Sequence, residues 1–256
     1  MCVGLAAHRF GTRRDDDKGD GKSALDVLGA TSLLAALLVA IVLSDAGTSY
    51  SGARSAAKVE ADTVDTLYES AEYVEMPARQ AIHAAALCYA RAVIGPEWAA
   101  MARGDTSSVP SNWTGTGSGG LRKVFIEMTP KAQGFGLVQS ADQMRGNLRT
   151  ERLTQAQPAV PEVLYWFMVF LIGLSLAGLA YSIPRSKNGA QLMALTLVVG
   201  LFAAVLLLIS NFDRPFSGPL ALEPSAMRNT EQDISDDYAA AYRVALPCDD
   251  QGNPLA

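Results

Sequence analysis

Val163 to Pro184 reads VLYWFMVFLIGLSLAGLAYSIP, a stretch without a charged residue. It is followed by a short basic turn that contains Arg185 and Lys187, and the stretch from Asn188 to Phe212 is again uncharged. The hydrocarbon core of a bilayer requires about 20 apolar residues in helical conformation to cross it. The two stretches therefore predict consecutive transmembrane helices over residues 163–183 and 190–212.

A third uncharged segment, Val27 to Ser44, is rich in Leu, Ala and Val. Because basic residues precede it, the alternative is the apolar region of a signal peptide. The segment is longer than the usual signal core of about 7–15 residues, and no clear small-x-small cleavage site follows it. We therefore expect a retained transmembrane helix over residues 27–44, and an all-α membrane protein with three transmembrane helices.

The remaining segments divide into three parts. Residues 1–26 form a charged arm, residues 45–162 an extramembrane helical domain, and residues 213–256 an acidic tail. Within the domain, an amphipathic pattern follows Ser49, and Pro77 suits the first turn of the next helix. Gly95-Pro96 is expected to end or kink that helix, because proline cannot continue it. Residues 105–120 have the composition of a flexible loop, and further helices are expected at 121–128 and 137–155.

Composition excludes several classes of protein. Charged residues make up 18% of the chain, against about 25% in soluble domains. The net charge is −5, and no basic stripe indicates nucleic-acid binding. Two histidines and three cysteines are too few and too scattered for a zinc or iron–sulfur site. We expect no metal and no cofactor.

No constellation of residues supports an enzyme. Gly115, Gly117 and Gly120 match the spacing of a dinucleotide-binding loop, but no strand precedes them. His83 is expected to be a packed or surface histidine. No ionisable residue lies near the centre of a span, which argues against a proton relay or an ion-coupled transporter.

Small residues recur at helical spacing in all three spans. These rows allow close helix packing in lipid, within or between subunits. They are Ser32, Ala36 and Ala40 in the first span, Gly173 and Ala177 in the second, and Gly200 and Ala204 in the third.

Four short motifs resemble the bestrophin-like domain family. These motifs are Glu60-Ala-Asp-Thr-Val-Asp-Thr-Leu-Tyr68, Tyr89-Ala-Arg-Ala-Val93, Glu97-Trp98 and Asp213-Arg-Pro-Phe-Ser-Gly218, and the resemblance extends from about residue 25 to about residue 225. The family consists of bacterial membrane proteins of largely unknown function that are distantly similar to bestrophins, which are pentameric anion channels with four spans per subunit. In bestrophins a Pro-Phe-Gly segment followed by an acidic run helps to bind calcium. Here Pro-Leu-Ala-Leu-Glu follows Gly218, so the resemblance does not imply calcium gating.

The family motifs, together with the arginines expected near the membrane surface, give a set of candidate binding or pore-mouth residues. Three arginines near the membrane surface, Arg149, Arg152 and Arg214, are expected to attract anions through their field. The full set is Glu60, Tyr68, Arg91, Glu97, Trp98, Arg149, Arg152, Asp213, Arg214, Pro215, Phe216 and Gly218.

The family usually has one more span at the amino terminus, and Met1 to Ala7 resembles its end. Two alternatives remain open: the chain is truncated there and lacks a fourth span, or its start is set too late. The basic arm and the basic turn at residues 184–188 favour a cytoplasmic amino terminus under the positive-inside rule. The helical domain would then face outward, and a disulfide between Cys88 and Cys248 would fit that side. Bestrophins, by contrast, hold their bulk in the cytoplasm, so the resemblance implies the opposite orientation and both alternatives remain open.

We therefore expect a multi-pass protein of the bacterial plasma membrane whose partners are the lipid bilayer, further copies of itself and small anions, with no nucleic acid. The expected function is an oligomeric anion channel. The alternative is a non-conducting membrane scaffold or sensor whose helical domain binds a partner.

Overall fold

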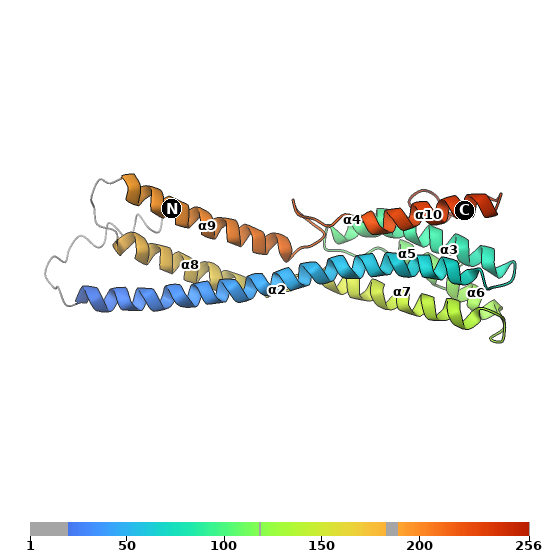
Figure 1. Cartoon of the computed structure of the whole chain (residues 1–256), viewed down its shortest axis with the longest axis horizontal. Helices are drawn as coiled ribbons and strands as arrows, with labels where there is room; N and C mark the ends of the chain where they lie inside the picture. Colours follow the sequence, from blue (N-terminus) through green and yellow to red (C-terminus); the bar gives the residue numbers. More distant parts are fainter. Residues whose placement is uncertain (1–19, 118, 183–188, 256) are drawn as a thin grey trace. The chain divides into compact units, whose positions relative to one another are not determined.

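The computed structural model describes residues 20–117, 119–182 and 189–255. Within these ranges the chain is helical, and its β-structure is limited to an isolated bridge between Cys248 and Pro254. Among the described residues, three helices are long and apolar enough to cross a membrane. The prediction of an all-α membrane protein with three such helices is confirmed (Figure 1). Residues 1–19 of the expected arm over residues 1–26 lie outside the described residues. The expected end of a fourth span, Met1 to Ala7, also lies outside them.

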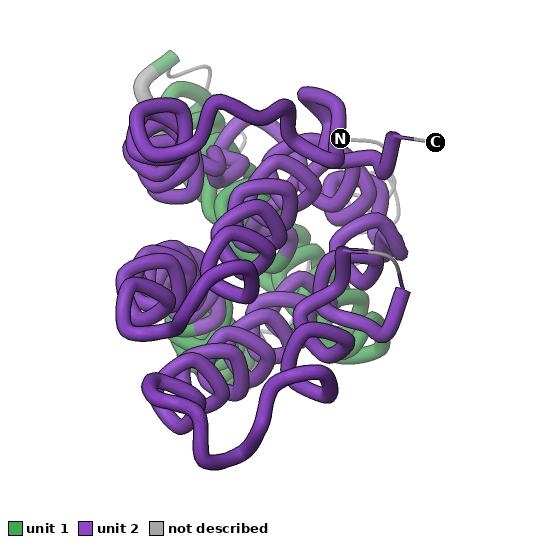
Figure 2. The backbone as a smooth tube through the Cα atoms, turned by 90° about the vertical axis from the view of Figure 1, so that its right-hand side faces the viewer, with its two compact units in different colours: residues 1–48, 158–213 green, residues 49–157, 214–256 purple. Residues whose placement is uncertain are grey.

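The helices of the chain form two compact units, which are coloured separately in Figure 2. The first comprises the described parts of Met1–Thr48 and Pro158–Asp213, and the second comprises the described parts of Ser49–Gln157 and Arg214–Ala256. Helix α2 (Asp20–Ala71) contributes to both units. The sequence predicted a span over residues 27–44 and a helical pattern from Ser49. In the structure the two are one continuous helix, since Gly47 and Gly52 each weaken a helix by only about 1 kcal/mol and no proline intervenes.

The first unit contains the amino-terminal part of α2 with α8 (Glu162–Ser182) and α9 (Gly189–Phe212). Its interior is a narrow apolar seam, and large apolar side chains on the opposite faces remain exposed, as on helices that have lipid as their solvent. The seam is made by Val39, Val42, Ala46, Val160, Met168, Ile172 and Ile209. The exposed side chains include Leu33, Leu37, Phe167, Phe170, Leu197 and Leu201.

The second unit is built around α3 (Ala78–Ala92), on which every residue from Ile82 to Ala90 is buried. The helix is enclosed on all sides, which its many alanines permit because they let neighbouring helices approach closely. Around it lie the second half of α2, α4 (Trp98–Met101), α5 (Val109–Thr114), α6 (Leu121–Glu127), α7 (Phe135–Gln155) and α10 (Ser225–Ala241).

Two expectations from composition differ from the structure. The expected loop over residues 105–120 contains α5, which buries Trp113. The expected acidic tail over residues 213–256 contains α10, which buries Met227, Ile234 and Tyr238. Both segments are polar on average, but a single apolar side chain per turn is enough to bind a short helix to a core.

Candidate functional site

The guanidinium group of Arg152 on α7 lies between two carboxylates in the interior of the second unit. Arg152 Nε donates to Glu60 Oε2 at 2.5 Å, and Nη2 donates to Glu97 Oε2 at 2.5 Å and to Glu60 Oε1 at 3.2 Å. All three side chains are fully buried. Ions placed out of contact with water are stable only when they are paired and hydrogen-bonded. We call these residues, together with Arg149, the ion network.

Arg149 makes the ion network electrically neutral. Its Nη2 donates to Glu97 Oε1 at 2.6 Å, and its Nε donates to the same oxygen at 3.0 Å. Two arginines therefore balance two glutamates. The Tyr89 hydroxyl donates to Glu60 Oε1 at 2.5 Å, so each carboxylate accepts several hydrogen bonds.

Burial and neighbouring charges shift the pKa values of Arg152 and of Tyr89, which contacts the ion network. Burial alone lowers the pKa of Arg152, but the neighbouring Glu60 and Glu97 more than offset this effect, and the pKa is raised. Burial, followed by the charge of Glu60, raises the pKa of Tyr89. Arg152 therefore remains charged and the Tyr89 phenol remains protonated near neutral pH.

A π-helical turn supplies Glu97. This turn, η2 (Val93–Glu97), contains Pro96, which has no N–H to donate to the preceding turn of the helix. The ladder widens there rather than breaking, as at many π-bulges near functional sites. The kink predicted at Gly95-Pro96 therefore takes the form of a wide turn that leads directly into α4.

Trp98 connects the ion network to the segment that follows α9. Arg152 lies over the Trp98 ring at 5.5 Å from its centroid, a cation–π contact. Phe216 packs edge-on against the same ring at 5.1 Å, and Trp98 Nε1 donates to Leu222 O at 2.9 Å. The segment folds back on itself, because Leu222 N donates to Pro215 O at 2.7 Å, and Gly218 provides the left-handed conformation with φ +83.

Asp213 and Arg214, the two residues that follow α9, differ in their surroundings. Asp213 is the last residue of the first unit. Its Oδ1 accepts hydrogen bonds from Ala159 N and Val160 N, both at 2.8 Å. Arg214 is exposed. Of the three arginines expected to attract anions, only Arg214 therefore carries an exposed charge. Arg152 is fully buried and Arg149 is paired with Glu97, so their charge is neutralised within the ion network.

Tyr68 and Arg91 lie away from the ion network. Tyr68 stacks on the buried His83 ring at 3.8 Å, and His83 Nε2 lies 3.0 Å from Tyr68 O. Arg91 Nε donates to Glu231 Oε1 on α10 at 2.8 Å, and its Nη1 lies 3.4 Å from Asp250 Oδ1. Arg91 therefore connects the carboxy-terminal part of the chain to the core, whereas Tyr68 packs against α3 within the core.

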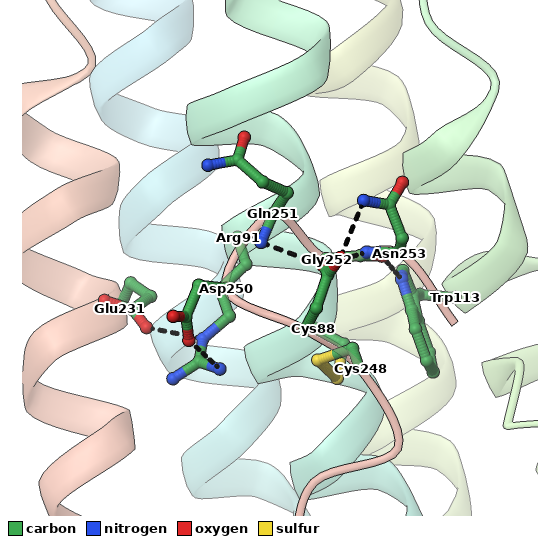
Figure 3. The surroundings of a disulfide bond; sticks show 10 residues. Cys88, Arg91, Trp113, Glu231, Cys248, Asp250, Gln251, Gly252 and Asn253 are labelled. Carbon is green, nitrogen blue, oxygen red and sulfur yellow. Dashed lines mark hydrogen bonds and ion pairs between the residues drawn. A yellow bond between two sulfur atoms is a disulfide. The ribbon is translucent and has the colours of Figure 1, made fainter. Parts of the chain in front are cut away.

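The carboxy-terminal segment, residues 242–255, is bound tightly to α3 (Figure 3). A disulfide joins Cys88 to Cys248, with 5.9 Å between the Cα atoms. Trp113 Nε1 donates to Gly252 O at 2.6 Å. Gly252 has φ +71 and lies so close to α3 that a Cβ atom there would be 2.4 Å from Ala92 N.

Sequence reasoning missed several residues of these sites. Tyr89 was quoted within a motif but not assigned a role, and Arg145, whose guanidinium lies 4.5 Å from the centroid of the Tyr89 ring, was not singled out. Only the spacing of the arginines along residues 145–152 could have indicated a common face. Over the described part of the chain, no group of three or more His, Cys, Asp or Glu residues is arranged to hold a metal ion.

Comparison with known proteins gives a consistent relationship. The model of the Bestrophin-like domain family matches residues 3–227. Two crystal structures of variants of a bacterial bestrophin homologue from Klebsiella pneumoniae are similar to the chain. One has a TM-score of 0.67 at 10% identity and covers 95% of this chain and 97% of its own; the other has a TM-score of 0.66 at 11% identity and covers 93% and 95%. None of the curated proteins compared with the chain matches it.

Proposed function

Since the chain belongs to the Bestrophin-like domain family, we propose that it is a plasma-membrane protein whose copies assemble around a shared axis and conduct small anions. The observation that carries the proposal is the similarity of its fold to a bacterial bestrophin homologue over nearly the whole chain. The two sequences are 10–11% identical, so the fold is what they share.

The small-residue rows of the spans support self-association. In the described chain Ser32, Ala36 and Ala40 are all exposed. Gly173 and Gly200 have open space where a Cβ atom would lie. These rows therefore do not serve the seam of the first unit. Since small residues in lipid favour close helix contact, a second copy is the partner that this surface fits.

A specific observation favours the competing function, a non-conducting scaffold or sensor. After Glu162, the described parts of α8 and α9 carry no charged side chain. A water-filled path along those helices would have apolar walls. Under this alternative the helical unit would bind a partner and the spans would only anchor it.

Chloride efflux from reconstituted vesicles tests the proposal. The purified full-length chain is incorporated into chloride-loaded vesicles, with protein-free vesicles as the background, and its mass in detergent is measured in parallel. We expect efflux above background and a mass corresponding to a ring of several copies. A monomer or dimer that shows no efflux in either orientation would contradict the channel and favour the scaffold.

The exposed Arg214 gives this experiment a matched pair of variants. If its field enriches anions near the path, Arg214→Gln lowers the preference for chloride over potassium, seen as a shift in reversal potential. Arg243→Gln removes the same charge from another exposed position and should leave the preference unchanged. If the two variants have the same reversal potential, Arg214 does not influence the anion path.

A further inference from the structure

The second unit contains a cavity of about 520 Å³ that lies beside Trp98 and is separate from the ion network. This volume is within the range of about 300–1,000 Å³ that is usual for small-molecule sites. One wall is a face of α2, and the opposite wall is made by residues 221–227, which lead into α10.

The α2 wall presents two cations at adjacent turns. Arg54 and Lys58 are four residues apart, so they lie on one face of the helix, and both are exposed along the cavity. Among the described residues neither forms an ion pair. The acidic residue of the opposite wall, Glu223, is 3.6 Å from Arg228 and so has its own counter-ion.

The opposite wall adds further positive potential and an apolar surface. Ser225, Ala226 and Met227 form the first turn of α10, a helix of 17 residues whose amino-terminal N–H groups lack intrahelical acceptors and have no side-chain cap. Trp98, Leu222 and Pro224 supply apolar surface in the same cavity. The cationic side chains and the helix N–H groups therefore favour an anion, while the rest of the lining favours an apolar group.

We propose that this cavity binds an amphiphilic anion, with a phosphate or carboxylate head held between Arg54, Lys58 and the first turn of α10, and an apolar or aromatic body against Trp98 and Leu222. The anion is a bound ligand and not a permeating ion, because inorganic anions would leave the apolar wall unused. The proposal does not depend on whether the chain conducts ions. The same chemistry is offered by a lipid phosphate and by a soluble aryl phosphate.

The test uses the purified full-length chain in phosphatidylcholine nanodiscs with 4-bromophenyl phosphate as the probe, since bromine quenches tryptophan fluorescence on contact. We expect saturable quenching in the wild type. The double variant R54Q/K58Q should weaken binding by at least about tenfold, because charge-assisted hydrogen bonds are lost. R122Q/K123Q removes the same charge from exposed positions on α6 and is the matched control. All substituted side chains are exposed, so the folded state should persist, which thermal unfolding checks.

A second arm distinguishes the source of the anion. Nanodiscs that also contain phosphatidylglycerol are analysed for lipid that remains bound after transfer to detergent. Retention by the wild type and the control, but not by R54Q/K58Q, would assign the cavity to a lipid head group. The proposal is overturned if neither probe distinguishes R54Q/K58Q from R122Q/K123Q. It is also overturned if inorganic phosphate binds as tightly as the bromophenyl ester, because the apolar wall would then contribute nothing.

Discussion

Arg152 illustrates at the scale of a residue why a buried charge has to be analysed together with its partners. Its planar guanidinium reaches Glu60 and Glu97 at the same time, which a lysine ammonium cannot do with equivalent geometry. The arrangement fixes the positions of α2, η2 and α7 within the second unit. Such a network provides a specific geometry more than net stability, because desolvation of the ions offsets much of their attraction.

Replacing Arg152 by an uncharged residue should lower the free energy of unfolding. Arg152→Met leaves Glu60 and part of Glu97 buried without a counter-ion, and we expect a loss of about 3–5 kcal/mol in unfolding free energy. Arg152→Lys should give an intermediate loss. Thermal unfolding of the full-length protein in detergent, followed by circular dichroism, measures both variants against Arg122→Met on the exposed surface of α6. Equal melting temperatures for Arg152→Met and Arg122→Met would show that the network carries no stability.

His83 gives the second unit a defined dependence on pH. Burial lowers its pKa below the ordinary value of 6.5, against the opposing effects of Glu72 and the Tyr68 carbonyl; Arg79 lowers it and Asp237 raises it. Its Nδ1 lies 3.2 Å from the Tyr242 hydroxyl. Below pH 6.5 the unfolded chain binds a proton that the folded chain does not yet bind, so stability falls as the pH decreases through this range.

We expect the melting temperature to decline below pH 6.5 in the wild type and this component of the decline to be absent in His83→Gln. His8→Gln, which removes the other of the chain's two histidines, is measured alongside. Identical pH profiles for all three proteins would mean that His83 does not titrate differently in the folded state.

At the scale of elements, the carboxy-terminal segment depends on a glycine. Gly252 combines a left-handed φ of +71 with a predicted Cβ position 2.6 Å from Cys88 O. Gly252→Ala should cost about 1–3 kcal/mol, because alanine is strained in this conformation and would also push the segment off α3. The matched control is Gly117→Ala, where a Cβ atom meets nothing within 4 Å. The melting temperatures of both variants are compared with that of the wild type. An unchanged melting temperature for Gly252→Ala would contradict the tight packing of the segment against α3.

The elements could be predicted from the sequence where their signal is local. Uncharged runs located the spans. Pro77 lies at the start of α3, and Gly95-Pro96 lies in the π-helical turn that follows α3. The ion network could not be derived in this way, since Glu60 and Arg152 are 92 positions apart and a charged residue in a helix ordinarily faces water. The resemblance to the family singled out Glu60, Glu97 and Trp98, and the expected position near the membrane surface singled out Arg149 and Arg152. Neither argument indicated that these residues meet in the interior.

The average composition of the polar segments did not predict the helices α5 and α10. Residues 105–120 are rich in Gly, Ser and Thr, yet Trp113 binds α5 to the core and donates to Gly252 O. The acidic residues after position 212 predicted an acidic tail and gave no sign of a helix, whereas Met227, Ile234 and Tyr238 are spaced to face the core from α10. In both segments a few apolar side chains, which an average conceals, determine the packing.

At the scale of the whole molecule, the disulfide bears on membrane orientation. Disulfides persist in oxidising compartments and are rare in the bacterial cytoplasm. Cys88 and Cys248 both belong to the second unit, so their bond favours a helical unit outside the cytoplasm. The basic residues of the amino-terminal arm favour the same orientation under the positive-inside rule. Two independent arguments, one from redox chemistry and one from charge, therefore agree.

Cysteine labelling tests this orientation directly. Lys123→Cys, in a Cys2→Ser background, places one free thiol at an exposed position of the helical unit. We expect a membrane-impermeant maleimide to label it in right-side-out spheroplasts as fully as after lysis, while Cys88 and Cys248 resist alkylation until a reductant is added. Labelling that appears only after lysis, together with free thiols at Cys88 and Cys248, would place the unit in the cytoplasm. The disulfide would then be absent from the cellular protein, and the positive-inside argument would fail with it.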